Sequence, residues 1–109
     1  MSLKSFIIKQ VSGLIAGQIN SWKKTAVKDQ NRIRESLINK AKNTAYGKDH
    51  NFEQINNYND FKKAVPIRDY EGLRTYIDRV TKGESDILWP GKPKYFAKTS
   101  GTTSGVKYI

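Results

Sequence analysis

Cysteine is absent from this sequence, and histidine and proline are scarce, with one histidine and three prolines among 109 residues. Without cysteine the chain has neither disulfides nor thiolate metal sites, which fits a reducing compartment. Long hydrophobic runs are missing too. The longest run near the N-terminus is Phe6-Ile7-Ile8, which Lys9 interrupts, and it is too short for a signal-peptide core or a membrane span. We therefore expect a soluble, cytoplasmic protein.

Acidic residues are also few. The 10 Asp and Glu residues face 20 Lys and Arg residues, which gives a net charge of +10 at pH 7. Such an excess attracts polyanions, whether nucleic acid, an anionic membrane or a phosphate-rich ligand. The sign of the charge does not distinguish among them. It would also mislead if the chain were one piece of a protein with an acidic remainder.

Apolar residues recur at helical spacing over most of the chain, which predicts about four helices and a mainly α fold. The first helix is expected over residues 3–22, ending near Ser21, and the second over 23–45, with Gly47 as its C-terminal stop. A short helix is expected over 60–64. Asp69 then predicts the cap of a fourth helix, which runs through about Thr81.

The pattern changes after Gly83. Residues 90–93 form a turn-rich hinge, 95–97 read as a strand, and 107–109 read as the beginning of another. The sequence thus predicts a helical subdomain over residues 1–90 and, over 91–109, a C-terminal β-hairpin stub that opens a second domain. Two strands make a marginal sheet, so we expect the second domain to be truncated.

The loop between these two strands carries most of the chemistry. A triphosphate needs converging N–H groups, small residues that let the backbone approach, hydroxyl donors and a cation. Residues 98–107 supply all of these. The spacing does not match a Walker A loop, because Val106 separates the second glycine from the lysine. By composition alone, the same segment is also typical of an ordinary flexible turn.

The string Thr99-Ser-Gly-Thr-Thr-Ser-Gly-Val-Lys107 resembles the phosphate loop of acyl-adenylate-forming enzymes, whose usual form is Thr-Ser-Gly-Thr-Thr-Gly-x-Pro-Lys. It departs from that form by the extra Ser104 and by Val106 in place of proline. This variation is similar to the auxin-responsive family of acyl-acid amido synthetases. Stretches within residues 44–52, 61–71, 76–84 and 88–91 resemble the same family in the same order, so the resemblance covers roughly residues 40–109.

The resemblance implies an ATP-dependent ligase with an α/β adenylate-forming fold in the full-length enzyme, in which residues 91–109 begin the nucleotide-binding domain. Such an enzyme uses ATP and Mg²⁺ to adenylate a carboxylic acid and then joins it to an amino acid. The expected phosphate-binding residues are Ser100, Gly101, Thr102, Thr103, Ser104, Gly105 and Lys107. No catalytic residue and no metal ligand is expected in this chain, which should be inactive alone.

Two other functions stay open from the residues themselves. The lysine-rich second helix could bind nucleic acid or an anionic membrane surface, although its charges are spread around the helix and match no known DNA-binding motif. Alternatively, the helices could form a protein-interaction domain with a Ser/Thr linker tail. We interpret the single histidine, His50, as a structural or solvated residue and expect neither nucleic-acid binding nor a membrane span.

Overall fold

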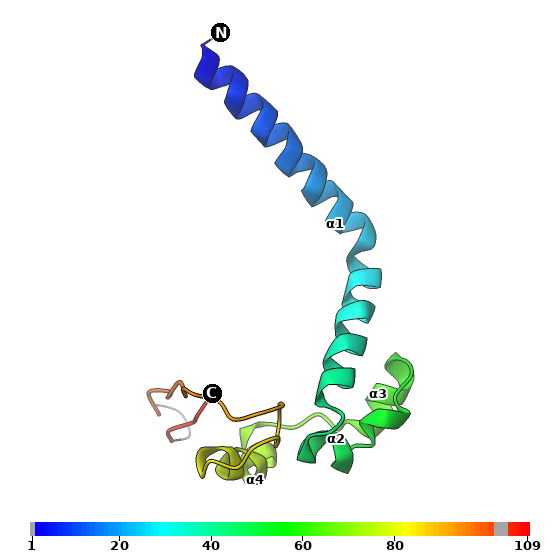
Figure 1. The fold of residues 1–109 in the computed structure, drawn as a ribbon, viewed down its shortest axis with the longest axis vertical. Coiled ribbons are helices and arrows are strands. Elements are labelled where there is room, and N and C mark those ends of the chain that lie inside the picture. The colour runs from blue at the N-terminus through cyan, green and yellow to red at the C-terminus, as the bar shows by residue number, and fades with distance from the viewer. Residues whose placement is uncertain (1, 102–104) are drawn as a thin grey trace. The chain divides into compact units, whose positions relative to one another are not determined.

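The structure is a computed structural model that describes residues 2–101 and 105–109. The chain divides into two compact units, Met1–Ile33 and Arg34–Ile109. In chain order the elements are helix α1 (Leu3–Ala41), helix α2 (Ala45–Asp49), the 3₁₀ helix η1 (Phe52–Gln54), helix α3 (Tyr58–Ala64) and helix α4 (Tyr70–Thr81) (Figure 1). The prediction of a mainly helical chain with about four helices is confirmed.

Helix α1 replaces the two helices predicted over residues 3–22 and 23–45. No break occurs at Ser21, which lies within the continuous helix, and its carbonyl accepts the Thr25 hydroxyl at 3.2 Å. The same hydroxyl donates to Asp29 Oδ2 at 2.6 Å. Serine and threonine side chains can end a helix when they replace backbone hydrogen-bond partners. Here the Thr25 side chain makes its hydrogen bonds within a continuous helix.

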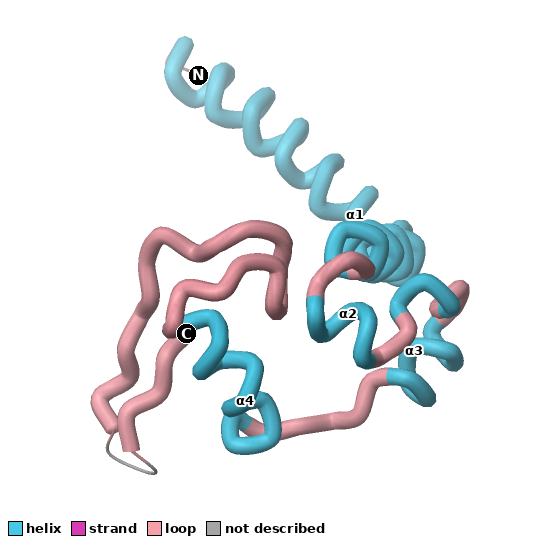
Figure 2. The backbone as a smooth tube through the Cα atoms, turned by 60° about the horizontal axis from the view of Figure 1, so that its bottom comes forward, coloured by secondary structure: helices cyan, strands magenta, loops and turns pink. Residues whose placement is uncertain are grey.

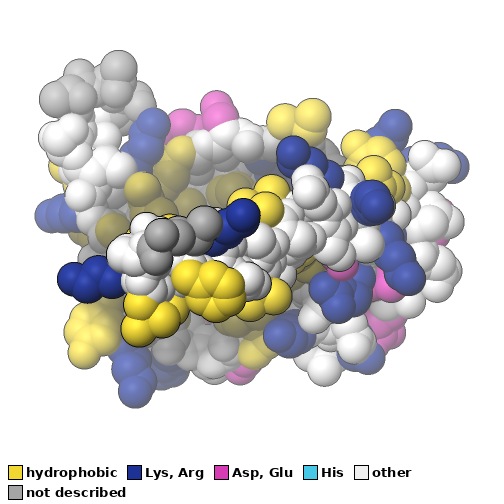
Figure 3. Space-filling view, turned by 90° about the horizontal axis from the view of Figure 1, so that it is seen from above, with side chains coloured by type: hydrophobic (Ala, Val, Ile, Leu, Met, Phe, Trp, Pro, Cys, Tyr) yellow, Lys and Arg dark blue, Asp and Glu magenta, His cyan; other side chains and the backbone are white. Residues whose placement is uncertain are grey.

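In the first unit, the apolar residues of α1 are exposed. Leu3 and Leu14 are 76% and 73% exposed, and Trp22 is 63% exposed. The apolar stripe, as we call this surface, consists of Leu3, Ile7, Ile8, Val11, Leu14, Ile15, Ile19 and Trp22. Figure 3 shows apolar side chains next to Lys and Arg side chains on the face that it presents. None of the described helices, α1 included, has a stretch both long and apolar enough to cross a bilayer.

The second unit begins at the junction between α1 and α2. Thr44, which is 1% exposed, caps α2: its hydroxyl donates to the Ala41 carbonyl at 2.7 Å and accepts from the Gly47 N–H at 3.0 Å. Gly47 lies inside α2, so its prediction as the end of the preceding helix was wrong. A Cβ at Gly47 would lie 2.2 Å from the Ala41 carbonyl oxygen. Only glycine therefore allows α2 to approach α1 this closely.

The first amides of α2 are satisfied by a segment some forty residues further along the chain. The N–H of Ala45 donates to the Asp86 carbonyl at 2.8 Å, and that of Tyr46 donates to the Ile87 carbonyl at 3.0 Å. Unpaired N–H groups at a helix start otherwise need water or a side-chain cap. Ile87 is only 3% exposed. These backbone bonds and this buried side chain hold the segment after α4 against the start of α2.

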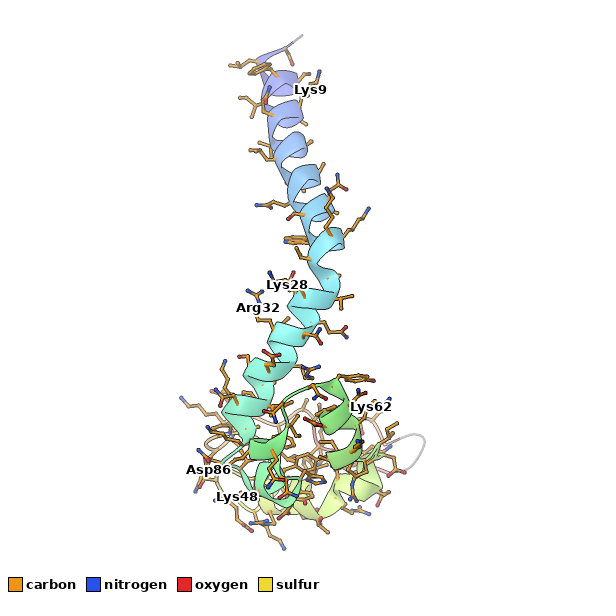
Figure 4. The ribbon with its side chains drawn as sticks, turned by 90° about the vertical axis from the view of Figure 1, so that its right-hand side faces the viewer. Lys9, Lys28, Arg32, Lys48, Lys62 and Asp86 are labelled. Atoms are coloured by element: carbon orange, nitrogen blue, oxygen red, sulfur yellow. The ribbon has the colours of Figure 1, made fainter. Side chains whose placement is uncertain are left out.

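Asp86 closes the turn that presents those carbonyls. It has φ = 57°, in the left-handed region, and its Oδ1 accepts from the Gly91 N–H at 2.7 Å. The Gly91 carbonyl accepts in return from the Asp86 N–H at 3.0 Å. The Gly91 hydrogen bond, helped by Ser85 and by the charge of Lys48, lowers the pKa of the Asp86 carboxyl below its usual value. Figure 4 shows Asp86 and Lys48 close together.

The core of the second unit is small. Ile38 and Ala41 of α1 pack on Phe52, and Tyr46, Ile55, Phe61 and Val65 surround them. The Tyr46 ring stacks on His50 at 4.0 Å and meets Tyr76 edge to face at 5.1 Å. Tyr76 donates its hydroxyl to Asp49 Oδ2 at 2.7 Å, which raises the pKa of the Tyr76 phenol. These rings join α2 to α4.

His50 belongs to this core. It is 7% exposed, and its Nδ1 lies 2.8 Å from the Tyr46 carbonyl oxygen. A buried ring with a backbone partner, stacked on a tyrosine, has a packing role. Of the two roles that the sequence left open for His50, structural and solvated, its burial supports the structural one.

Side-chain caps set the starts of the last two helices. Asn57 caps α3 by accepting from the Asp60 N–H at 2.9 Å, so this helix begins earlier than residue 60. Asp69 caps α4 by accepting from the Gly72 N–H at 2.9 Å, and Lys82 and Gly83 (φ = 89°) close it. The predicted bounds of the fourth helix are confirmed.

The predicted hairpin is reduced to an antiparallel pairing of single residues. Among the described residues no strand is formed, and an isolated bridge joins Lys98 to Tyr108. Figure 2 shows the two paired segments, residues 97–99 and 107–109, lying side by side as loops. We call these segments the arms. A two-stranded pairing without further strands is marginal, which accounts for its short extent.

Replacing Gly47 by alanine tests the close approach of α2 to α1. We expect Gly47→Ala to destabilise the chain by on the order of 2 kcal/mol, because the clashing Ala41 oxygen belongs to the backbone and cannot rotate away. This cost exceeds the gain of about 1 kcal/mol that alanine brings to a helix. Thermal unfolding followed by circular dichroism measures the change. Gly13→Ala is the matched control, since a Cβ there meets nothing within 4 Å; equal melting temperatures for the two variants would contradict the account.

Asp86→Asn tests whether the negative charge of Asp86 stabilises the turn that it closes with Gly91. Asparagine tolerates the left-handed conformation, so this change removes the charge and little else. A lowered folded-state pKa stabilises the protein above the unfolded pKa of about 3.9, and this stabilisation is lost as the pH falls through the lower folded value. We therefore expect the melting-temperature difference between wild type and variant to be largest near pH 7 and to shrink below pH 3.8. If the melting-temperature difference stayed constant over this pH range, it would come from a change in side-chain packing and not from the loss of the charge.

Candidate functional site

The candidate site is the loop that connects the two paired arms at the C-terminal end of the second unit. Its base is closed by backbone bonds: Ala97 and Ile109 exchange two at 2.9 and 2.8 Å, and Thr99 N–H donates to the Lys107 carbonyl at 2.9 Å. The Thr99 hydroxyl accepts from the Lys107 N–H at 2.9 Å. Thr99 thus holds both backbone groups of Lys107. We call this arrangement the neck of the loop.

Two glycines face each other just above the neck. Gly101 and Gly105 have φ angles of 74° and 83°, in the region that favours glycine. A Cβ at Gly101 would lie 3.1 Å from the Val106 nitrogen and 3.2 Å from the Gly105 carbonyl carbon. The two sides of the loop are therefore in backbone contact here. Val106, which stands where the related loops have proline, is part of this contact.

The predicted phosphate-binding residues divide into two groups. Ser100, Gly101, Gly105 and Lys107 are described, and the structure brings the last three together at the neck; Ser100 is exposed. Thr102, Thr103 and Ser104 lie outside the described residues. The role of all seven residues in binding phosphate stays a prediction.

Each lysine that flanks the loop lies over an aromatic ring. The Lys107 Nζ is 5.7 Å from the centre of the Tyr70 ring, and the Lys98 Nζ is 5.7 Å from that of Tyr108. Tyr70 also accepts, through its hydroxyl oxygen, from the Tyr108 N–H at 3.1 Å. The C-terminal arm of the loop is thus attached to the first residue of α4.

The sequence offered little indication of this role for Tyr70, which lies at apolar spacing in the fourth helix. Its place directly after the capping Asp69 was the available signal. At a helix start, a tyrosine can pack its ring and still offer its hydroxyl to a neighbouring segment. Which segment it would meet depended on the tertiary fold.

The residues that the structure describes contain no metal cage. In the part of the chain that the structure describes, no three His, Cys, Asp or Glu side chains are grouped so that they could hold a metal ion. Magnesium in nucleotide sites is usually bound by one or two carboxylates together with the phosphates themselves. A hollow of about 230 Å³ lies between Val80 and residues 87–93, below the range of about 300–1,000 Å³ for ligand pockets.

Comparison with known proteins places the chain in a family. Residues 15–109 match the GH3 family N-terminal domain. The chain is similar to an indole-3-acetic acid-amido synthetase, GH3.15, of Arabidopsis thaliana, with 35% identity over 78 residues, which are 71% of this chain and 13% of the relative. It is also similar to a 4-substituted benzoates-glutamate ligase, GH3.12, of the same plant, with 44% identity over 48 residues, 43% of this chain and 8% of the relative.

A further Arabidopsis thaliana indole-3-acetic acid-amido synthetase, GH3.6, shares 29% identity over 81 residues, 73% of this chain and 13% of its own length. No solved structure matches the chain. The chain spans about an eighth of the length of GH3.15 and GH3.6. The match to the family's N-terminal domain covers most of the chain and includes the neck and the flanking lysines, so the chain belongs to the GH3 family.

Proposed function

We propose that this chain is the N-terminal part of an ATP-dependent acyl-acid amido synthetase, and that residues 98–107 bind the terminal phosphates of ATP. The observation that carries the proposal is the neck, in which Thr99 holds Lys107, together with the backbone contact of Gly101 and Gly105 just above it. A loop pinched at its base, with glycines that permit close approach, suits an anionic ligand. The relatives, named as amido synthetases and a ligase, support the reaction class.

The proposed reaction has two steps. A carboxylate oxygen of the acid attacks the α-phosphorus of ATP, the bond from that phosphorus to the bridging oxygen breaks, and pyrophosphate leaves. The amine of an amino acid then attacks the acyl carbon, AMP leaves with the carboxylate oxygen, and the amine loses a proton. The first step concentrates negative charge on pyrophosphate. Fixed donors around that group lower the barrier because they need no reorganisation during the reaction.

In this proposal each type of residue in the loop has a different role in binding phosphate. Ser100, Thr102, Thr103 and Ser104 donate hydroxyl hydrogen bonds to phosphate oxygens. Gly101 and Gly105 allow the backbone to wrap closely, and Lys107 supplies positive charge. Bound Mg²⁺ would neutralise further phosphate charge. We assign no catalytic residue and no metal ligand to this chain.

The proposal also divides the chain into a helical subdomain, residues 1–90, and the beginning of a nucleotide-binding domain, residues 91–109. One phosphate loop cannot immobilise a nucleotide, because the entropy lost on binding exceeds what a few hydrogen bonds return. We therefore expect the 109-residue chain to bind ATP weakly and to lack turnover.

ATP–pyrophosphate exchange tests the proposed function in a longer polypeptide that begins with these 109 residues. We expect exchange that depends on a carboxylic acid, and none from residues 1–109 alone. Replacing Thr102 or Thr103 by alanine should lower kcat/KM for MgATP roughly 10- to 100-fold, the value of a hydrogen bond to a charged group. Thr81→Ala is the control, because that hydroxyl bonds to the Asp78 carbonyl at 3.0 Å, within α4. Unchanged turnover in both loop variants would remove the loop from the mechanism.

A second candidate function is attachment to an anionic membrane surface through the first unit. Every charged side chain before Asp29 is a lysine, and the apolar stripe of α1 is exposed. A helix with one apolar face and lysines on the others suits the boundary between lipid headgroups and acyl chains. Figure 4 shows Lys9 and Lys28 projecting away from the axis of α1.

Sedimentation with lipid vesicles tests this second candidate. We expect the chain to sediment with vesicles that contain phosphatidylglycerol and to stay in solution with phosphatidylcholine alone, because the lysines need anionic headgroups. Ile15→Asp, within the apolar stripe, should abolish binding, whereas Ile67→Asp, at a fully exposed position of the second unit, should not. Failure to sediment with anionic vesicles at low salt would end this candidate.

A further inference from the structure

We propose that Tyr70 is a positioning residue for the phosphate loop: it anchors the C-terminal arm of the loop to α4 and keeps the Lys107 ammonium group at the neck. The inference rests on the proposed function, which supplies the phosphate that the loop would bind. Tyr70 lies outside the loop, thirty-seven positions before Lys107 in the sequence, and determines how the loop is attached to the second unit.

A hydrogen bond from the Tyr108 N–H attaches the C-terminal arm of the loop to Tyr70. Residues along an antiparallel pair alternate between pointing their backbone groups at the partner and away from it. Lys107 and Ile109 bond to the opposite arm, so the N–H of Tyr108 points away from the pair. An unpaired edge N–H needs a partner. The Tyr70 hydroxyl oxygen accepts it at 3.1 Å and thereby fixes the arm to the helix.

Lys107 also approaches Tyr70 through its side chain. Its backbone N–H and carbonyl are both bonded to Thr99, at 2.9 Å each. The long side chain would otherwise sample many rotamers, but its Nζ lies 5.7 Å from the centre of the Tyr70 ring. A cation over a ring face is attracted to it. Tyr70 therefore narrows the range of positions for the charge that the proposed function assigns to phosphate, which lowers the ordering cost on binding.

A comparison within the chain separates this role from ordinary surface packing. Tyr58 begins α3 as Tyr70 begins α4, and the Lys62 Nζ lies 5.4 Å from its ring centre. That lysine is on the same helix, so the contact is local. Tyr58 is 57% exposed, whereas Tyr70 is half-buried and its contacts reach residues 107 and 108. Tyr58 thus provides a matched control.

The test is a titration of the 109-residue chain with inorganic tripolyphosphate, followed through the amide resonances of Gly101, Gly105 and Lys107 by NMR. Tyr70→Phe keeps the ring and removes the hydroxyl, Tyr70→Leu removes both, and Tyr58→Leu is the control. The shifts of the Lys107 side-chain methylene protons report whether the ammonium group stays beside the Tyr70 ring, from whose centre its Nζ lies 5.7 Å away. The affinity for tripolyphosphate is the readout that a merely structural role for Tyr70 would leave unchanged.

We expect the ring-induced shift of the Lys107 methylenes to persist in Tyr70→Phe and to vanish in Tyr70→Leu, while Tyr108 N–H loses protection from exchange in both. Tripolyphosphate affinity should fall about threefold or more in Tyr70→Leu, as expected for a lost cation–π contact, and stay unchanged in Tyr58→Leu. If wild type and Tyr70→Leu bind equally, the inference is overturned and the proposed function stands. If tripolyphosphate moves no loop resonance of the wild type, the proposed function fails, and the inference with it.

Discussion

The second unit depends on one steric constraint, the contact between the end of α1 and the start of α2. The Ala41 carbonyl oxygen accepts the Thr44 hydroxyl at 2.7 Å, and it also occupies the space that a Cβ at Gly47 would need. The glycine lets the helices meet, and the buried threonine satisfies both backbone ends at once. A buried polar group must be paired. The close approach of the two helices buries the Thr44 hydroxyl, which therefore needs the two hydrogen bonds that it makes there.

This contact is linked to the candidate site through α2. The first amides of α2 bind the carbonyls of Asp86 and Ile87, which fixes the segment that leads from α4 into the paired arms. Tyr46 and Asp49 of α2 hold Tyr76 of α4 by ring contact and hydrogen bond. Helix α4 in turn presents Tyr70 to the loop. Helices α2 and α4, which have few buried side chains, thus support the neck mainly through hydrogen bonds and contacts between aromatic rings.

The sequence predicted the local features well. Asp69 and Gly83 marked the ends of α4 because caps act within a few residues, and the mainly helical class followed from apolar spacing. The loop pointed to the family through its glycines and hydroxyls and through a resemblance, and the family match confirms the family. The phosphate-binding role of all seven loop residues stays a prediction, as do the domain boundary at residue 90 and the compartment.

The features that the sequence did not reveal depend on contacts that residue type and local spacing do not specify. Gly47 resembles a helix stop by its type, and the Ala41 oxygen that requires it lies across a turn. Helix α2 is short, and its N-terminal amides are satisfied by residues 86 and 87. The break expected near Ser21 does not occur, because α1 runs without interruption from Leu3 to Ala41. The contact of Tyr70 with residues 107 and 108 has no counterpart in any local spacing.

The most direct measurement is an experimental structure of a longer polypeptide that begins with this chain, with MgATP or a non-hydrolysable analogue bound. If the loop binds phosphate, oxygens of the β- and γ-phosphates will lie within hydrogen-bonding distance of residues 100–105, with the Lys107 ammonium group beside them. A nucleotide whose phosphates lie far from that loop would contradict the account.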